Sequence, residues 1–320
     1  MDKPLVSIVT PSYNQGRFIE QNILSIKGQS YPNIEHIIID GGSTDQTLDI
    51  LKLYEGTYNM RWSSSPDNGM YHAINKGFSH AKGAIFAYLN TDDNYMPWSV
   101  ETAVGYFTRH SDIDLVYGGL IQVGLGENQH LGLILPATIG MLKRGQSLEQ
   151  PTVFWNRKVY KKLGGFDEDF VCAGDIDFWR RAISVFKFLQ IKEILAIEHV
   201  HSNRLSLIKI KKLAEEVKKL DSKYLSLSNA HFYSKLFKKL NDIFWMKIHG
   251  IIFIFSYLMY NKTKKRYPYA RLFGFTNFII KNPINFIVGC VPFCNKGFKR
   301  WKLDGNFRWE QGALKYYEPS

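Results

Sequence analysis

Short apolar runs alternate with amphipathic segments along the first 120 residues of the chain. The apolar runs are rich in Val and Ile, which is typical of strands, and the segments between them carry apolar residues at helical spacing, as Ile19, Ile23 and Ile26 do. Strands that alternate with helices indicate βαβ units, so we predict a mostly parallel, Rossmann-type α/β sheet with helices on both faces. The predicted strands are 6–10, 34–40, 61–63, 85–89 and 115–117, and the predicted helices are 18–26, 47–54, 70–79 and 98–107.

The pattern changes in the second half of the chain. A glycine-rich loop is expected over residues 124–145, and an ordered block with one helix over 175–186 follows it. Beyond residue 201, Lys clusters alternate with apolar runs. We therefore predict an α/β domain over residues 1–205 and a basic, aromatic-rich, mostly helical region over 206–320.

The net charge of +12 belongs to this second region alone. Residues 1–199 carry 18 basic and 22 acidic side chains, whereas residues 200–320 carry 23 basic and 7 acidic ones. A basic region rich in aromatic residues suits either an anionic membrane surface or nucleic acid. The three cysteines are widely scattered, and no basic segment with a long apolar run precedes the first strand. Reduced thiols and the lack of a secretory signal lead us to expect a cytoplasmic protein.

Polar residues follow three of the predicted strands at the point where each strand ends. Tyr13 follows the first strand, and Asp40 closes the second strand ahead of two glycines. Asp92 and Asp93 follow the fourth. The carboxyl ends of parallel strands meet at one edge of the sheet, where α/β proteins bind their ligands. An aromatic ring stacks on a base, and carboxylates bind Mg²⁺ or Mn²⁺, so the combination predicts a site for a nucleotide diphosphate and a divalent metal.

Each of these groups alone has a simpler interpretation. Asp-Gly-Gly is a common turn, and an aspartate before a helix is often only an N-cap. Their coincidence at one edge of the sheet favours a binding site. No Gly-x-Gly-x-x-Gly follows the first strand, which disfavours a dinucleotide-dependent dehydrogenase, and a Walker-type phosphate loop is also missing.

The chain resembles the inverting glycosyltransferases of family 2, which have the GT-A fold, in two long stretches. These are VSIVTPSYNQGRFIEQNILSIKGQSYPNIEHIIIDGGSTDQT and SPDNGMYHAINKGFSHAKGAIFAYLNTDD, and the resemblance extends over residues 4–205. It implies metal-dependent transfer of a hexosyl group from a nucleotide-diphosphate donor, with Mn²⁺ or Mg²⁺ as the metal. It further implies a role of the kind that such enzymes have in bacterial surface-polysaccharide assembly.

The resemblance also assigns a donor site. Pro11 and Tyr13 would flank the nucleobase, and Asp40 would accept a hydrogen bond from it. Asn75 and Lys76 would lie nearest the diphosphate. The donor-binding residues that the resemblance implies are Pro11, Tyr13, Asp40, Asp67, Asn75, Lys76 and Asp92.

The metal is assigned to the acidic pair in the same way. Asp93 would ligate the metal, and Asp92 would contact the ribose or the water shell of the metal. His201 begins a loop that resembles the one closing the donor site in many relatives, where the His joins the metal. Many relatives have Asp where this chain has Asn90, so we expect a weaker affinity for the metal but not its loss.

The helix predicted in the second half begins with residues that resemble the family's acidic helix start. The resemblance places Asp175 at the position of the catalytic base and Gly174 where Glu is common. An inverting transfer needs one carboxylate to take the proton of the attacking hydroxyl. Asp175 is also a natural N-cap, and Asp177 is either the alternative base or a first-turn acid favoured by the helix dipole. Trp155 and Trp179 either form an apolar platform for a sugar ring or pack in the core.

The basic region combines amphipathic and apolar segments. Its longest stretch without a charged residue, 248–260, is too short for a transmembrane helix, which needs about 20 residues. Apolar faces flanked by Lys predict segments that lie in an anionic membrane surface, and the alternative is a helical subdomain packed on the catalytic core. Nucleic acid is disfavoured because long Phe and Ile runs would not face phosphates. The segments are an amphipathic helix at 208–223, apolar runs at 243–260, 272–280 and 284–294, and a basic cluster at 262–266.

The leading hypothesis is an enzyme that transfers one sugar to a hydroxyl of a lipid-linked glycan, from a peripheral position on the cytoplasmic face of the cell membrane. Single transfer is favoured because the chain has neither the clear membrane spans nor the Gln-x-x-Arg-Trp signature of processive members. A soluble or protein acceptor is one alternative, and a catalytically silent scaffold that binds a nucleotide sugar or a membrane is another. The joint presence of Asp92, Asp93 and Asp175 favours an enzyme, because a silent scaffold does not need all three.

Overall fold

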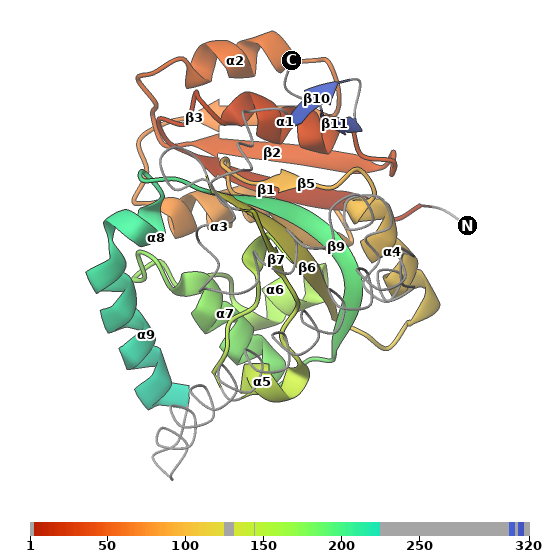
Figure 1. Cartoon of the computed structure of the whole chain (residues 1–320), viewed down its shortest axis with the longest axis vertical. Coiled ribbons are helices and arrows are strands. Elements are labelled where there is room, and N and C mark those ends of the chain that lie inside the picture. The colour runs from red at the N-terminus through yellow and green to blue at the C-terminus, as the bar shows by residue number, and fades with distance from the viewer. Residues whose placement is uncertain (1–2, 125–130, 144, 225–306, 311–312, 317–320) are drawn as a thin grey trace, which may run out of the picture.

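A nine-stranded sheet runs through the middle of the molecule, and helices pack on both of its faces (Figure 1). The computed structural model describes residues 3–124, 131–143, 145–224, 307–310 and 313–316. The strands of the sheet are β1 (Val6–Ser12), β2 (Ile34–Asp40), β3 (Met60–Ser64), β4 (Ile85–Tyr88), β5 (Asn94–Tyr95), β6 (Leu115–Gly124), β7 (Leu131–Ile134), β8 (Val153–Asn156) and β9 (Phe188–Val200). The helices are α1 (Ile19–Lys27), α2 (Thr47–Tyr54), α3 (Met70–His80), α4 (Ser99–Arg109), α5 (Ile139–Lys143), α6 (Arg157–Leu163), α7 (Gly174–Ile183), α8 (Leu205–Ile208), α9 (Ile210–Tyr224) and the 3₁₀ turn η2 (Gln150–Thr152).

The relative direction of the strands differs between the two halves of the sheet. Strands β3, β2, β1 and β4 lie side by side and are all parallel, as predicted. The next strand, β8, is antiparallel to both of its neighbours, β4 and β6. Beyond it β6 and β9 are parallel, while β7 and β5 pair antiparallel with them. The sheet is therefore mixed, and a mostly parallel arrangement holds only for the N-terminal half, because the apolar pattern of a strand does not record the direction of its neighbour.

Strand β2 shows how both faces of the sheet are covered. Ile37 and Ile39 belong to the buried cluster that contains the apolar side chains of α3. Ile38, between them, packs with Ile19 and Ile23 of α1. Successive residues of a strand point to opposite faces, so this alternation places α3 on one face and α1 on the other. The predicted covering of both faces by helices is confirmed.

The region predicted as a glycine-rich loop contains more structure than its composition indicates. It includes β7 and the short helix α5, and β6 continues to Gly124. The 13-residue strand β9 is also absent from the predicted strands. The pairing of β6 with β9 contains a register shift on either side of Gly119, which interrupts the strict alternation by which a strand is recognised.

The start of the basic region packs against the α/β domain. Helix α9 agrees with the predicted amphipathic helix, and its Leu220 is fully buried in the cluster that contains the apolar residues of α7. Strands β10 (Phe307–Glu310) and β11 (Ala313–Tyr316) form a separate antiparallel pair. The predicted apolar runs at 243–260, 272–280 and 284–294 and the basic cluster at 262–266 lie outside the described residues. Of the helices that the structure describes, none has both the length and the apolar content needed to cross a membrane.

A close approach between α3 and β1 gives a test of this packing. A Cβ atom on Gly77 would lie 2.4 Å from Cγ1 of Val9, whereas a Cβ atom on Gly105 of α4 would have nothing nearer than Arg109 at 3.5 Å. We expect Gly77→Ala to lower the free energy of unfolding by about 1–3 kcal/mol through overpacking. Gly105→Ala should raise it by roughly 0.5–1 kcal/mol, because Ala is the better helix former. Urea unfolding of both variants checks this, and a Gly77→Ala protein as stable as the parent would contradict the packing described here.

Candidate active site

The acidic pair lies in a tight turn directly after β4. The backbone N–H of Asp93 donates to the carbonyl of Asn90 at 3.0 Å. The side chain of Asn22, fully buried on α1, donates to the carbonyls of Asn90 and Asp93 at 2.9 and 3.0 Å. Helix α1 therefore holds the turn from behind. Asn22 is missing from the predicted site, although a polar residue among the buried isoleucines of α1 is a visible signal in the sequence.

The carboxylate of Asp93 is buried without a hydrogen-bond partner among the described residues. Its residue is only 1% exposed, and both side-chain oxygens are unpaired. Burial raises the pKa of Asp93 well above its usual range, and the neighbouring charge of Asp92 raises it further, while Arg204 opposes both effects. A divalent cation would satisfy such a carboxylate, because Mg²⁺ and Mn²⁺ are commonly held by one or two carboxylates together with substrate phosphates. The described residues contain no group of three or more His, Cys, Asp or Glu that could hold an ion by itself.

Two histidines approach Asp92 from the end of β9. Nε2 of His201 lies 3.1 Å from Oδ2 of Asp92, and the His201 ring stacks on Phe18 with a centroid distance of 4.5 Å. Nδ1 of His199 lies 2.7 Å from the backbone oxygen of Asp92 and donates to it, since a carbonyl only accepts. The structure thus brings His201 to Asp92, the neighbour of Asp93, although His201 and Asp92 are 109 positions apart in sequence.

The positive charge of Arg204 interacts with Asp92 and Asp93. The guanidinium of Arg204 donates to Glu198 of β9, and its charge favours the ionised forms of both Asp93 and Asp175. Glu149, just before η2, belongs to the same cluster, and burial, followed by the charge of Glu198, raises its pKa to about 7. Arg204 lies within the loop that resembles the donor-site loop of relatives, but the sequence alone did not single out its role.

The residues predicted for the donor form a second group at the same edge of the sheet. Tyr13 is 60% exposed at the end of β1. A Cβ atom on Gly41 would lie 2.9 Å from the carboxylate of Asp67 and 3.3 Å from the ring of Tyr13, so both side chains lie close to this glycine. Nζ of Lys76 donates to the hydroxyl of Ser65 at 2.9 Å. Pro11 is buried, and its carbonyl accepts a hydrogen bond from Thr91 at 2.7 Å, which ties the end of β1 to the acidic turn.

Asp40 and Asn75 have contacts that direct them into the protein. The carboxylate of Asp40 is fully buried and accepts hydrogen bonds from Gly42, Ser43 and Ser64. Asn75 donates to Phe166 and Glu168, and its side-chain oxygen accepts from Tyr160 and Phe166. All four hydrogen-bonding positions of the Asn75 amide are therefore used within the protein. Asn75 therefore does not offer a free hydrogen-bonding group to a diphosphate. Asp40 instead fixes the loop that follows β2.

Asp175 lies in the first turn of α7, opposite the hydroxyl of Tyr71 on α3. The Tyr71 hydroxyl is 3.2 Å from Oδ1 of Asp175 and from its backbone nitrogen, and the backbone N–H of Ile176 donates to the same carboxylate at 2.8 Å. Burial raises the pKa of Asp175 to about 6, although these hydrogen bonds and Arg204 favour its ionised form. Asp175 as a whole residue is partly exposed to solvent. These properties suit a general base near neutral pH.

The structure gives a steric reason for Gly174, where relatives commonly have Glu. A Cβ atom at this position would lie 2.7–2.9 Å from three ring carbons of Tyr71. The ring of Tyr71 therefore occupies the space that a longer side chain needs, and its hydroxyl contacts the adjacent Asp175. Tyr71, like Asn22 and Arg204, was not singled out by the sequence.

Asp177, the alternative base, has a different environment. It is 1% exposed, accepts from Arg181 at 2.7 Å and from the hydroxyl of Tyr224 at 2.8 Å, and lies 3.6 Å from Nζ of Lys223. A buried carboxylate held by these groups from α7 and α9 is suited to fixing the helices together. The geometry therefore favours Asp175 over Asp177.

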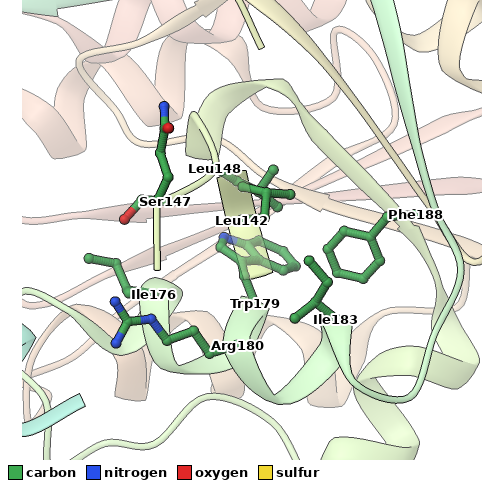
Figure 2. Close-up of a pocket in the computed structure, with 9 residues that line it drawn as sticks. Leu142, Ser147, Leu148, Ile176, Trp179, Arg180, Ile183 and Phe188 are labelled. Carbon is green, nitrogen blue, oxygen red and sulfur yellow. The ribbon is translucent and has the colours of Figure 1, made fainter. Parts of the chain in front are cut away.

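Trp155 and Trp179 are both buried in the same hydrophobic cluster. Trp155 is fully buried and packs edge-to-face on Trp179 with a centroid distance of 5.2 Å, which makes it a core residue. Trp179 lines a small pocket beside α7, shown in Figure 2, together with Ile176, Leu148 and Phe188. No sugar platform formed by both rings exists in this arrangement.

The mixed α/β sheet with an acidic turn at one edge agrees with the GT-A fold that the sequence resembles. The model of the family described as Glycosyl transferase family 2 matches residues 7–169 of this 320-residue chain. A glycosyltransferase of Mycobacterium tuberculosis is 31% identical over 194 residues, which are 60% of this chain and 74% of that protein. The chain belongs to glycosyltransferase family 2.

Solved structures agree with this fold. Residues 1–349 of Staphylococcus aureus TarS, in complex with UDP-GlcNAc, superpose with a TM-score of 0.55 at 18% identity, covering 98% of this chain and 99% of that one. This chain spans 48% of a longer TarS structure. A mannosyltransferase of Pyrobaculum calidifontis, in complex with GDP-Man and Mn²⁺, also gives 0.55 at 16% identity, covering 95% and 89% of the two chains.

The environment of Asp175 predicts a pH dependence. A base must be ionised to take a proton, so kcat/KM of the enzyme should fall as the pH drops through about 6, the pKa of Asp175. Asp175→Asn should lower turnover by roughly 10²–10⁴-fold and remove this acidic limb. Asp177→Asn should keep the limb and lower the thermal stability, because it weakens the contacts to Arg181 and Tyr224. A crippled Asp177→Asn beside a near-normal Asp175→Asn would reverse the assignment.

Proposed function

We propose that the protein is a non-processive, inverting glycosyltransferase that moves one sugar from a nucleotide-diphosphate donor to a hydroxyl of a lipid-linked glycan. One observation carries the proposal: the charge of Arg204 favours the ionised forms of both Asp93 and Asp175. The charge of one guanidinium thus acts on a carboxylate suited to a metal and on a carboxylate suited to a base. Transfer from a diphosphate needs both, at opposite ends of the reacting sugar.

The donor site in this proposal follows the edge of the sheet. The exposed ring of Tyr13 stacks on the base, and Asp67, which like Tyr13 lies close to Gly41, contacts the base or ribose. Lys76 and Arg204 supply positive charge for the diphosphate. Asp40 supports this surface through the loop that it holds. The complexes of TarS with UDP-GlcNAc and of the archaeal mannosyltransferase with GDP-Man support a nucleotide sugar as the donor class.

Asp93 is the residue proposed to hold a divalent metal, with Asp92 and His201 beside it. When bound, the metal neutralises the charge that develops on the departing diphosphate. Asp175 takes the proton of the acceptor hydroxyl as that hydroxyl attacks the anomeric carbon from the side opposite the diphosphate. The Tyr71 hydroxyl orients the Asp175 carboxylate for this step. A single base is sufficient because the diphosphate leaves without needing a proton.

The surface around α8 supports a membrane-bound acceptor. Leu207, Ile208 and Ile210 are 44%, 62% and 59% exposed, and the lysines at positions 209, 211 and 212 are also exposed. This docking surface, residues 207–212, begins three positions after Arg204 of the site. Apolar side chains flanked by Lys are suited to an anionic lipid surface. We therefore propose that the enzyme is peripheral on the cytoplasmic face of the cell membrane, with the region from 206 onward as its membrane-associating part.

Removal of the metal tests the chemistry. Excess EDTA should abolish turnover of the nucleotide sugar, and added Mn²⁺ or Mg²⁺ should restore it. Asp93→Asn keeps the shape of the side chain and removes its charge, so it should abolish turnover and also the metal-dependent part of the thermal shift caused by the donor. Asp112→Asn, an exposed aspartate paired with Lys187, is the matched control and should behave as the parent. Full activity in EDTA would exclude the metal, and no turnover of any nucleotide sugar would favour the silent scaffold.

Sedimentation with lipid vesicles tests the membrane proposal. The full chain should pellet with vesicles rich in anionic lipid at low salt and less so as salt rises, because each Lys or Arg contributes about 1 kcal/mol at such a surface and is screened by ions. Joint replacement of Ile208 and Ile210 by Asn should weaken the salt-resistant part of binding. Neutralising Lys262, Lys264, Lys265 and Arg266 should weaken the salt-sensitive part. Leu53→Asn, which changes a 68% exposed residue on α2, is the control. A chain that stays in the supernatant would favour a soluble acceptor.

A further inference from the structure

Glu216 is a buried acidic residue on α9. Most of the other residues of this helix are exposed, and many of them are Lys. Glu216 is 5% exposed, whereas its neighbours Glu215 and Lys218 are open to solvent. Its carboxylate accepts hydrogen bonds from three consecutive backbone N–H groups: Oε1 from Val171, and Oε2 from Cys172 and Ala173, each at 2.9 Å. Three successive N–H groups that converge on one carboxylate form an anion-binding nest.

The segment that forms this nest, residues 171–173, is followed closely in the chain by the proposed base, Asp175. Ala173 is the N-cap of α7, and Gly174 and Asp175 are the first two residues of that helix. The N-cap residue Ala173 makes no side-chain cap hydrogen bond of its own, and the carboxylate that accepts from its backbone N–H comes from α9. A negative charge at a helix N-terminus is favourable, and charged acceptors form stronger hydrogen bonds than neutral ones. The path of the chain just before Asp175 is therefore set by a residue more than 40 positions away.

We propose that Glu216 is a positioning residue for the catalytic base, which fixes the segment 171–173 so that Asp175 meets Tyr71 and the acceptor hydroxyl. The proposal depends on the function proposed above, in which Asp175 is the base. Glu216 itself does not touch the substrate. Its effect on catalysis is transmitted through three backbone hydrogen bonds and two residues of chain.

Attachment of α9 does not explain this arrangement, because other contacts provide it. Asp221 pairs with Arg180 of α7 at 2.7 Å, the Tyr224 hydroxyl donates to Asp177, and Leu220 is fully buried. These residues join α9 to the body of α7, whereas Glu216 alone among them contacts the segment that precedes Asp175. The two kinds of contact can therefore be separated by mutation.

The test compares Glu216→Gln with Asp221→Asn and with the exposed control Glu215→Gln. The amide of Gln removes the charge and one of the two acceptor oxygens, so the amides of residues 171–173 should exchange hydrogen faster. Because small misplacements of a catalytic group are costly, kcat should fall roughly 10- to 100-fold in Glu216→Gln. The KM for the donor should stay unchanged, and so should the thermal shift caused by the nucleotide sugar. Asp221→Asn should lower the thermal stability but keep kcat, and Glu215→Gln should match the parent.

The pH profile adds a measurement that a general loss of stability does not change. The hydrogen bonds from Tyr71 and Ile176 favour the ionised form of Asp175, so a displaced Asp175 should titrate at a higher pH. The acidic limb of Glu216→Gln should therefore move up from about 6, and that of Asp221→Asn should not. A parent-like kcat and limb in Glu216→Gln would overturn the proposal, as would an equal loss of kcat in Asp221→Asn. Asp175→Asn is measured in parallel: if it is fully active, the proposed base is wrong, and if it alone is inactive, only the role of Glu216 fails.

Discussion

An unpaired, buried carboxylate at the end of β4 is the constraint around which the site is arranged. An ionised carboxylate removed from water costs several kcal/mol unless a charge or a metal compensates it. Neither side-chain oxygen of Asp93 makes a hydrogen bond of normal geometry among the described residues, and the charge of Arg204, followed by the backbone of His199, favours its ionised form. The turn nevertheless stays in place because Asn22 binds its backbone from α1. A turn fixed in this way, with an unsatisfied carboxylate, is consistent with the divalent cation and the donor phosphates of the proposed function.

The second carboxylate of the site is governed by different forces. Burial raises the pKa of Asp175 to about 6, and the neutral and backbone hydrogen bonds from Tyr71 and Ile176 oppose this rise only in part, so the carboxylate remains available for a proton. Asp177, two residues further along the same helix, is tied by Arg181 and Tyr224 and serves the packing of α9. Two acids on one turn of α7 thus have separate tasks. Their environments, and not their residue type, make the difference.

Helix α9 contributes both to the proposed docking surface and to the contacts that hold the segment before the proposed base. Its first residues belong to the exposed apolar and basic docking surface, and Glu216 on its buried side binds the segment before Asp175. The start of the region predicted from charge as basic and mostly helical is therefore in direct contact with α7. Its remaining predicted segments, from 243 onward, lie outside the described residues, so their place at a membrane stays a prediction.

The sequence by itself determined the parallel strands β1 to β4, the helices between them and the polar residues at the strand ends, because these depend on local periodicity and on where each strand stops. It did not determine the antiparallel insertion of β8 or the inward contacts of Asp40 and Asn75. It also did not indicate that Asn22 would hold Asp93 or that Glu216 would hold the segment before Asp175. The contacts of Asn22 and Glu216 join residues separated by more than 40 positions. Only the tertiary structure decides them, because the residues around a buried polar side chain such as Asn22 can mark it as unusual but do not identify a hydrogen-bond partner so distant in sequence.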